Sequence, residues 1–227
     1  MKLTNLANTF TIFGNFPVFE EDNVSIINKV YSDCNISINN EPTKDPNKPS
    51  RLMQISDPKK HITIYLRTNR IDVQAPGVDY LNKTKLLADT SDIFKAFSQM
   101  FNEWGTRIAY VGSYFIFDDN DEVLHKVSSL LNILPSESHM AEVNLRINSI
   151  ETLNNETYNN VFNVNNVRIG ASNNPSERRK ALMFTFDINT IASNNEERFN
   201  IHELSPLYEE LYNYTYSKIE ELQEKLS

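Results

Sequence analysis

Arginines are the side chains of this chain best suited to hold a charged ligand. Four of them, Arg67, Arg70, Arg107 and Arg146, fall in or beside strand-like segments. A guanidinium presents several N–H donors in a planar fork that fits a carboxylate or a phosphate. If two of these arginines met a carboxylate in one pocket between a sheet and its helices, they would hold a small anionic ligand. The chain would then be a sensor or an enzyme.

A second basic group, Arg178, Arg179 and Lys180, precedes a strand-like run. Clustered basic side chains on a sheet can bind a nucleic acid through its phosphates. They are also common on turns and sheet edges, where they keep other strands from pairing. The chain has 22 Lys and Arg against 30 Asp and Glu, a net charge of -8, which disfavours a nucleic-acid partner. A pseudo-symmetric fold would place this group close to Arg67 and Arg70.

Four tyrosines, Tyr208, Tyr212, Tyr214 and Tyr216, follow one another near the end of the chain. A tyrosine on a helix surface combines apolar area with a hydroxyl, and it is therefore enriched at protein interfaces. Packing of the rings against a sheet is the alternative explanation. We predict a protein interface at Tyr208, Tyr212 and Tyr216.

The common signatures of catalysis and cofactor binding are missing from the sequence. With five glycines it has neither a GxxxxGK[ST] nor a GxGxxG loop, and no serine lies in a GxSxG turn. His61, His125, His139 and His202 lack the spacing of a zinc site. The acidic run from Asp118 to Glu122 is typical of a helix start. We predict no cofactor, no metal and no catalytic residue, and an enzyme without a linear signature stays an alternative.

Cys34 is the single cysteine, so no disulfide can form within the chain, which is typical of a reducing compartment. No run approaches the roughly 18 consecutive apolar residues of a membrane span. The first residues also lack the apolar stretch of a signal peptide. We therefore expect a cytoplasmic protein that has no contact with a membrane.

Arg67 and Arg70 lie in a segment that we predict to be a three-stranded β-meander. Arg51–Ser56 and His61–Leu66 are strand-like runs on either side of a turn, and Asn69–Gln74 alternates apolar with polar residues. Ahead of this meander, the apolar residues between Phe10 and Phe19 predict a strand that is kinked at a glycine and a proline. A short amphipathic helix then begins at the acidic residues after Phe19.

A longer helix follows the meander, capped by Thr90 or Ser91, lined by Phe94 and Phe97 and ended by Gly105. The order of elements then begins again. We predict a strand at 108–117, a short helix at 123–131, and strands at 142–150, 158–169 and 181–188. The last element is an amphipathic helix that starts at Asn200 with a capping box.

Both halves of the chain thus have the order strand, short helix, several antiparallel strands and long helix. We predict an α+β fold, in which a curved antiparallel sheet carries the helices packed on one face. We further predict an internal duplication with halves 1–106 and 107–227. Chance repetition of the element order is the alternative. The opposite face of the sheet would be a binding surface.

This order of elements resembles a family of sporadically distributed bacterial proteins of unknown function. The resemblance is carried by the meander of Arg51–Gln74, the aromatic helix Ile93–Trp104 that leads into Arg107–Val111, and the late strand Leu182–Ile188 with the long helix after it. It covers most of the chain and implies no catalytic residues. The patchy occurrence of that family implies a setting in phage or mobile-element conflict.

The function that we predict first is non-enzymatic binding of another protein inside the cell. It rests on the missing catalytic signatures and on the acidic, Asn-rich surface that the loops would present. The alternatives are a sensor or enzyme that holds a small anion with the sheet arginines, and a nucleic-acid binder that uses the basic turns. A continuous positive stripe would favour the last of these, whereas scattered charges would exclude it.

Overall fold

The computed structural model describes residues 2–41, 50–77, 82–101, 103–131, 142–170, 178–194 and 196–227. The chain begins with β1 (Thr4–Phe13), α1 (Glu21–Val30), β2 (Asn35–Glu41), β3 (Ser50–Asp57), β4 (Ile62–Arg67), β5 (Arg70–Pro76) and α2 (Lys83–Met100). It continues with β6 (Trp104–Gly105), β7 (Arg107–Phe117), α3 (Glu122–Leu131), β8 (Asn144–Leu153), β9 (Glu156–Ile169) and β10 (Arg179–Thr190). It ends with β11 (Phe199–Asn200), the 3-10 turn η2 (Ile201–Glu203) and α4 (Leu204–Leu226).

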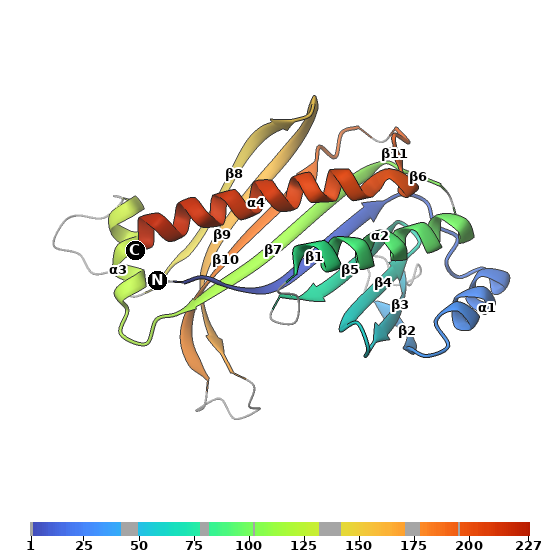
Figure 1. Ribbon diagram of the computed structural model, residues 1–227, viewed down its shortest axis with the longest axis horizontal. Helices are drawn as coiled ribbons and strands as arrows, with labels where there is room; N and C mark the ends of the chain where they lie inside the picture. Colours follow the sequence, from blue (N-terminus) through green and yellow to red (C-terminus); the bar gives the residue numbers. More distant parts are fainter. Residues whose placement is uncertain are drawn as a thin grey trace.

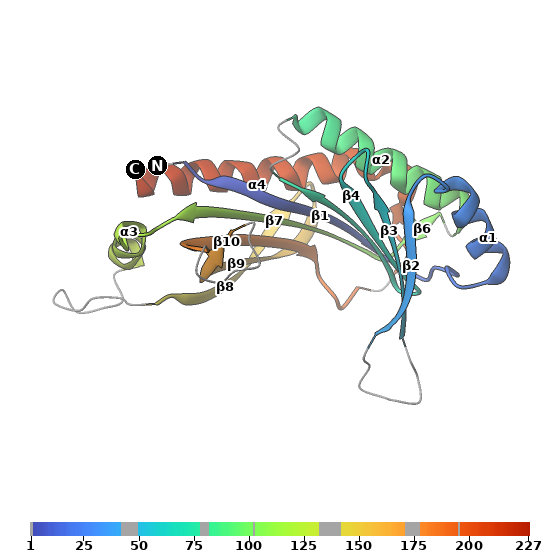
Figure 2. The same ribbon diagram turned by 90° about the horizontal axis from the view of Figure 1, so that it is seen from below.

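Nine of the strands form one sheet in the order β2-β3-β4-β5-β1-β7-β10-β9-β8, and every neighbouring pair is antiparallel. The sheet curves across its width, and the long helices α2 and α4 both lie on one of its faces (Figures 1 and 2). The predicted fold class is therefore confirmed. No helix in the described part of the chain has both the length and the apolar character of a membrane span.

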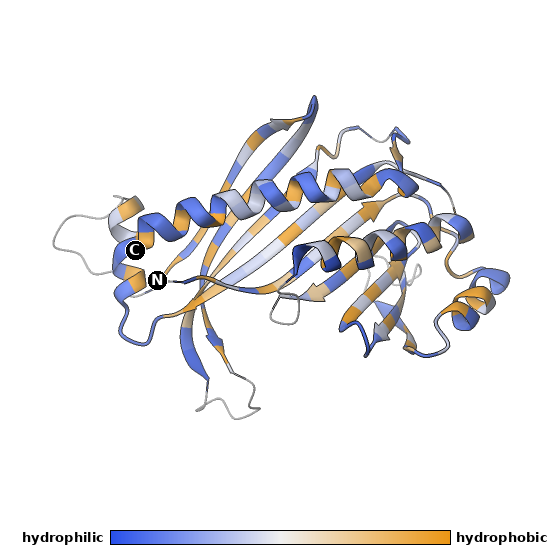
Figure 3. Cartoon of the chain, in the orientation of Figure 1, coloured by the Kyte–Doolittle hydropathy of each residue, from blue (hydrophilic) through white to orange (hydrophobic). Residues whose placement is uncertain are grey.

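The helices cover this face because the strands alternate. In β4, Ile62, Ile64 and Leu66 are buried, whereas the residues between them are partly exposed. Side chains of a strand point alternately to its two faces, so one face becomes apolar and packs against the helices. Figure 3 shows this alternation along the strands. The opposite face of the sheet is covered by no helix among the described residues and carries polar side chains together with the rings of Phe13, Phe115 and Phe117.

α4 crosses the middle of the sheet and joins the two halves of the chain. Its buried residues are spaced three, four or seven apart, as in an amphipathic helix. Tyr208 packs on Phe10 of β1 and on Phe94 of α2, with ring centroids 5.2 and 5.4 Å apart. Gly112 of β7 allows the close approach of α4, because a Cβ atom there would lie 3.3 Å from Cγ2 of Thr215.

Both halves share one pairing scheme. β1 pairs with β5, the last strand of the meander in the first half, and β7 pairs with β10, the last long strand of the second. β1 and β7 pair with each other and join the halves. The first half contributes five strands to the sheet and the second contributes four. The duplication with halves 1–106 and 107–227 stays a prediction.

The meander and the short helices α1 and α3 lie where the sequence predicts them, whereas several boundaries differ. β1 starts at Thr4 and ends before Gly14, so the predicted strand is confirmed at Phe10–Phe13 and wrong from Gly14 to Phe19. α2 starts at Lys83, because the side chain of Asn82 accepts a hydrogen bond from the Lys85 amide. Thr90 lies inside this helix and donates to the carbonyl of residue 86 instead of capping it.

The ends of the two long helices also differ from the prediction. α2 ends at Met100, before Gly105, because Trp104 and Gly105 pair with Asn200 and Phe199 as the short strands β6 and β11. Asn200 caps the 3-10 turn η2 rather than α4, since its side chain accepts a hydrogen bond from the His202 amide. α4 starts only at the end of this turn.

Candidate functional site

The helix-free face of the sheet carries three of the predicted arginines in one row. Arg67 lies opposite Arg70, Arg70 lies opposite Phe13, and Phe13 lies opposite Arg107 on the next strand. Residues that are opposite each other in antiparallel strands share a face. The meander and the β1–β7 pairing therefore bring together side chains that are as far apart as residues 13 and 107.

Two carboxylates neutralise the arginines at one end of this row. Arg67 donates to both carboxylate oxygens of Glu41, at 2.8 and 2.7 Å, and to Asp72 at 2.8 Å. Nε of Arg70 forms an ion pair with Asp72 at 3.0 Å, and the hydroxyl of Thr11 donates to the other oxygen of Asp72 at 2.7 Å. Hydrogen bonds from Arg67 lower the pKa of the Glu41 carboxyl.

A concavity of about 410 Å³ lies over this network. Its lining residues are Phe13, Glu41, Ser50, Arg67, Asn69 and Arg70. Two of the predicted arginines and a carboxylate do converge, as an anion site requires. Two guanidiniums face two carboxylates, however, so the group has little net charge left to attract an anion. The network stabilises the junction of β2, β4 and β5.

The other two sheet arginines lie outside this concavity. The guanidinium carbon of Arg107 lies 4.7 Å from the centroid of the Phe13 ring, and its Nε donates to the carbonyl of Thr190 at 3.2 Å. Burial, followed by the charge of Arg198, lowers the pKa of the Arg107 guanidinium. Arg146 lies on β8, where it is exposed and opposite Asn163. The four arginines therefore do not form one site.

The second basic group lies at the opposite end of β7. Arg179 donates to Asp119 at 3.0 Å, and Lys180 forms an ion pair with Asp121 at 3.4 Å. Arg107 begins β7, whereas Ala181 pairs with the last residue of this strand, Phe117. At about 3.3 Å per residue the two groups are roughly 30 Å apart, so the expected proximity is wrong. Arg178 is exposed just before β10. The described basic residues form scattered groups rather than a positive stripe.

The tyrosines of α4 differ in their exposure. Tyr208 is 1% exposed, and its hydroxyl donates to the carbonyl of Thr11 at 2.6 Å. A role for Tyr208 as an interface anchor is therefore wrong, because the ring belongs to the core. Tyr212 packs on Tyr110 with centroids 5.8 Å apart, and Tyr216 stacks on Tyr212 and is 46% exposed. An interface at Tyr212 and Tyr216 stays a prediction.

The acidic run before α3 acts as a helix cap. The carboxylate of Asp118 accepts hydrogen bonds from the amides of Val123 and Leu124, both at 2.9 Å. Within the described residues, no group of three His, Cys, Asp or Glu side chains could hold a metal ion. His139 lies outside the described residues. Burial raises the pKa of the Cys34 thiol, which makes it a poor nucleophile at neutral pH.

One feature of the sheet was missed by the sequence reasoning: β8 is a regular edge strand. It pairs with β9 over ten residues without a change of register, through a two-residue turn of Asn154 and Asn155 with φ values of 45° and 65°. None of its side chains is buried. Ile147 and Ile150 are 45% and 60% exposed, on opposite faces. The Asn154-Asn155 dipeptide is a sequence signal for the β8–β9 hairpin. It does not indicate that β8 lies at the edge of the sheet.

Along the outer edge of β8, the backbone hydrogen-bonding groups meet no strand of the described part of the chain. The carbonyl of Val143 accepts from the amide of Asn166 on β9 at 3.2 Å. Because backbone groups of an antiparallel strand alternate in direction, the odd-numbered residues of β8 face β9. The even-numbered residues, from Asn144 to Thr152, direct their N–H and C=O groups away from the sheet. No described strand pairs with them.

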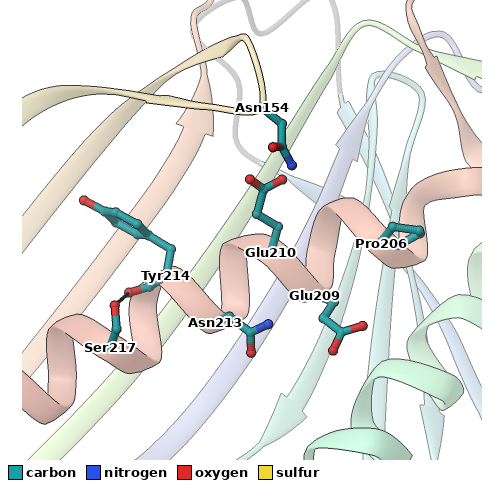
Figure 4. Close-up of a pocket in the computed structure, with 7 residues that line it drawn as sticks. All are labelled: Asn154, Pro206, Glu209, Glu210, Asn213, Tyr214 and Ser217. Carbon is teal, nitrogen blue, oxygen red and sulfur yellow. Dashed lines mark hydrogen bonds between the residues drawn. The ribbon is translucent and has the colours of Figure 1, made fainter.

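On the helix side, β8 and β9 extend beyond α4 (Figure 1). A concavity of about 540 Å³ lies along α4 near the β8–β9 turn, and Figure 4 shows its residues Asn154, Pro206, Glu209, Glu210, Asn213, Tyr214 and Ser217. Glu210 and Tyr214 point from α4 toward the β8–β9 hairpin. Burial and the nearby Glu151 carboxylate raise the pKa of Tyr214 to about 12. This end of the hairpin is acidic.

The other end of the same side is apolar. A concavity of about 60 Å³ lies between α3, α4 and the strands β8 to β10, and it is lined by Val127, Leu130, Leu145, Phe162, Val164, Phe184 and Leu222. Ile147 pairs with Phe162 next to it. The edge of β8 thus runs from an acidic end at the turn to an apolar end near α3.

Comparisons with known proteins add no family: neither a protein-family model nor a curated protein matches this sequence. The resemblance to the sporadically distributed bacterial family stays a prediction.

Proposed function

We propose that this protein is a non-enzymatic binding protein, which recognises an extended segment of another polypeptide by strand addition at the outer edge of β8. One observation carries the proposal. β8 is a regular ten-residue edge strand with no buried side chain and with exposed isoleucines on both faces. An unpaired edge of this kind is a template for another strand.

Strand addition would pair the outward backbone groups of β8 with those of the added segment. Natural edge strands are usually protected by charged side chains, above all lysine, or by proline, a bulge or short length. β8 contains neither lysine nor proline, and its pairing with β9 has no bulge. Its two charged residues, Arg146 and Glu151, have opposite signs, so a partner of complementary charge can pair with both. The other edge strand, β2, is shorter, and Arg67 holds Glu41 at its end. β8 is therefore the edge better suited to a partner.

The two alternative functions have less support in the geometry. The concavity at Arg67 and Arg70 is neutralised by Glu41 and Asp72, which weakens the case for an anionic ligand. Scattered and paired basic residues weaken the case for a nucleic acid. A bacterial cytoplasm, in a setting of phage or mobile-element conflict, is the environment that we propose from the resemblance described above.

A displayed library of random dodecapeptides, selected on the full-length protein, tests this function. Asn148→Pro removes an outward N–H group without breaking the β8–β9 ladder, whereas Asn148→Ala keeps this group and serves as the matched control. We expect selected peptides to bind the wild-type protein and Asn148→Ala, and to lose binding to Asn148→Pro. Thermal unfolding of the three proteins checks that all are folded. Peptides that bind Asn148→Pro as well as the wild type would refute strand addition.

A further inference from the structure

We propose that the segment added to β8 runs antiparallel to it and carries a basic residue opposite Glu151, apolar residues opposite Ile150 and Ile147, and an acidic residue opposite Arg146. This inference rests on the proposed function and names the chemistry of the partner. In the order of the partner chain, the pattern is basic, apolar, any two residues, apolar, acidic.

The antiparallel direction follows from the sheet. All eight neighbouring strand pairs of the nine-stranded sheet are antiparallel. Hydrogen bonds between antiparallel strands are perpendicular to the strands, and these pairs are the more stable kind. An added antiparallel strand would continue the twist and spacing already set by β9.

The acidic end of β8 favours a basic residue in the added segment. Glu151 pairs with Tyr158, and the carboxylates of Glu156 and Glu210 lie near the same tyrosine and raise its pKa after burial does. Arg198 neutralises Glu156, at 3.0 Å. Glu151 and Glu210 remain as negative charge on the helix side, with Glu151 on β8 and Glu210 on α4. A lysine or arginine opposite Glu151 would face its carboxylate directly, and Glu210 would add negative charge farther in, toward α4.

The middle of the edge calls for apolar residues on both faces. Ile147 points to the helix side, where its partner on β9 is Phe162, which lines the apolar concavity. Ile150 points to the helix-free face, opposite Asn159, and is 60% exposed. Apolar side chains opposite these two isoleucines would cover area that is now in contact with water.

The end of β8 that carries Arg146 favours an acidic residue in the added segment. Arg146 lies on the helix-free face opposite Asn163 and is exposed. No carboxylate of the described residues forms an ion pair with it. Glu151 and Arg146 therefore give the two ends of the edge opposite charges, which fixes both the direction and the register of an added strand.

Two fluorescein-labelled peptides of ten residues test the charge pattern by fluorescence anisotropy. The first has Lys, Ile, Ile and Glu as its third, fourth, seventh and eighth residues and threonine elsewhere. The second exchanges the Lys and the Glu, so composition is unchanged. We expect the first to bind the wild-type protein about tenfold more tightly at low salt. The double variant Arg146→Glu/Glu151→Lys should reverse this preference.

Two further variants separate strand addition from the charge pattern. Asn148→Pro should abolish binding of the first peptide, whereas Ile26→Lys should leave it unchanged. Ile26 lies on α1 and is 43% exposed, which matches the exposure of Ile147. Thermal unfolding again confirms that each variant is folded.

Three outcomes would overturn the inference. If both peptides bind the wild-type protein equally and neither binds Asn148→Pro, the charge pattern is refuted and strand addition is supported. Binding of neither peptide would also refute the pattern, and the displayed library would then decide on strand addition by itself. A wild-type dimer in sedimentation velocity, dissociated by Asn148→Pro, would identify a second copy of the chain as the occupant.

Discussion

At the residue scale, Arg67, Arg70 and Arg107, which the sequence offers for ligand binding, make their contacts within the fold. Arg67 on β4 bridges Glu41 on β2 and Asp72 on β5, and it thereby ties these three strands together. Its side chain is 17% exposed, so the interaction takes place largely away from water. Removing one partner of such a pair leaves the other charge uncompensated.

Replacement of this arginine should therefore destabilise the protein. We expect Arg67→Met to lower the free energy of unfolding by about 1–3 kcal/mol, since Glu41 would lose its ion-pair partner and Asp72 would keep only Arg70. Urea unfolding measures the change. Lys218→Met serves as a control, because Lys218 forms an ion pair on the surface of α4 and should change stability by less than about 0.5 kcal/mol. Equal effects of both changes would contradict the structural role of Arg67.

The pKa of Glu41 gives the stability a dependence on pH. Arg67 lowers the pKa of this carboxyl in the folded protein below its ordinary value of 4.5. The unfolded chain therefore binds the proton more readily, so the stabilisation is present above about pH 4.5 and is lost as the pH falls through the folded pKa. Urea unfolding at several pH values should show that the free energy of unfolding falls less steeply with decreasing pH in Glu41→Gln than in the wild type. An equally steep fall in this variant would contradict the role of the Glu41 carboxylate.

At the element scale, local sequence patterns predict the presence of helices and strands. They do not predict where these elements end or which strands lie side by side. The meander and the helices α1 and α3 have clear periodicity and turn residues, and the sequence places them correctly. The start of β1 contains Asn5 and Asn8, and asparagine is depleted in strands, so propensity gives only a weak strand signal there. β6 and β11 have two residues each, which is too short for any periodicity.

The site depends even more on pairing that no local pattern encodes. Glu41 meets Arg67 only because β2, β3 and β4 are neighbours in one register. Tyr208 is buried because α4 crosses β1, a contact between residues about two hundred positions apart. The edge position of β8 follows from the strand order of the whole sheet. The sequence identifies arginines and tyrosines as candidate binding residues, but it predicts neither their partners nor their exposure.

The cap of α3 offers a prediction about a single element. Asp118 accepts from two amides at the start of this helix and is 6% exposed. We expect Asp118→Ala to lower the free energy of unfolding by about 1–2 kcal/mol, because the first turn loses its acceptor. Asp118→Asn should cost less, since one oxygen remains. Chemical unfolding of both variants tests this, and an Asn variant as unstable as the Ala variant would contradict a capping role.

At the scale of the whole molecule, the two halves depend on each other. β1 lies between β5 and β7, so half of its backbone partners come from the second half of the chain. Phe10, Phe94 and Tyr208 form one aromatic cluster across the boundary. A separate first half would expose this apolar surface and one edge of β1 to water.

We therefore expect residues 1–106, expressed alone, to lack cooperative unfolding. Circular dichroism during heating should show no sharp transition for this fragment, and limited proteolysis should degrade it faster than the full chain. Mixing the fragment with residues 107–227 should restore the transition if both halves are needed for one core. A fragment 1–106 that unfolds cooperatively by itself would contradict this dependence and would support two autonomous halves.

Hydrogen exchange by NMR tests the claim of strand addition most directly. The amides of Arg146, Asn148 and Ile150 point away from the sheet, whereas those of Leu145 and Ile147 face β9. With a peptide selected from the displayed library bound, exchange of the three outward amides should slow at least about tenfold, and the two inward amides should change little. Unchanged exchange at the three outward amides, together with protection elsewhere on the sheet, would contradict strand addition at β8.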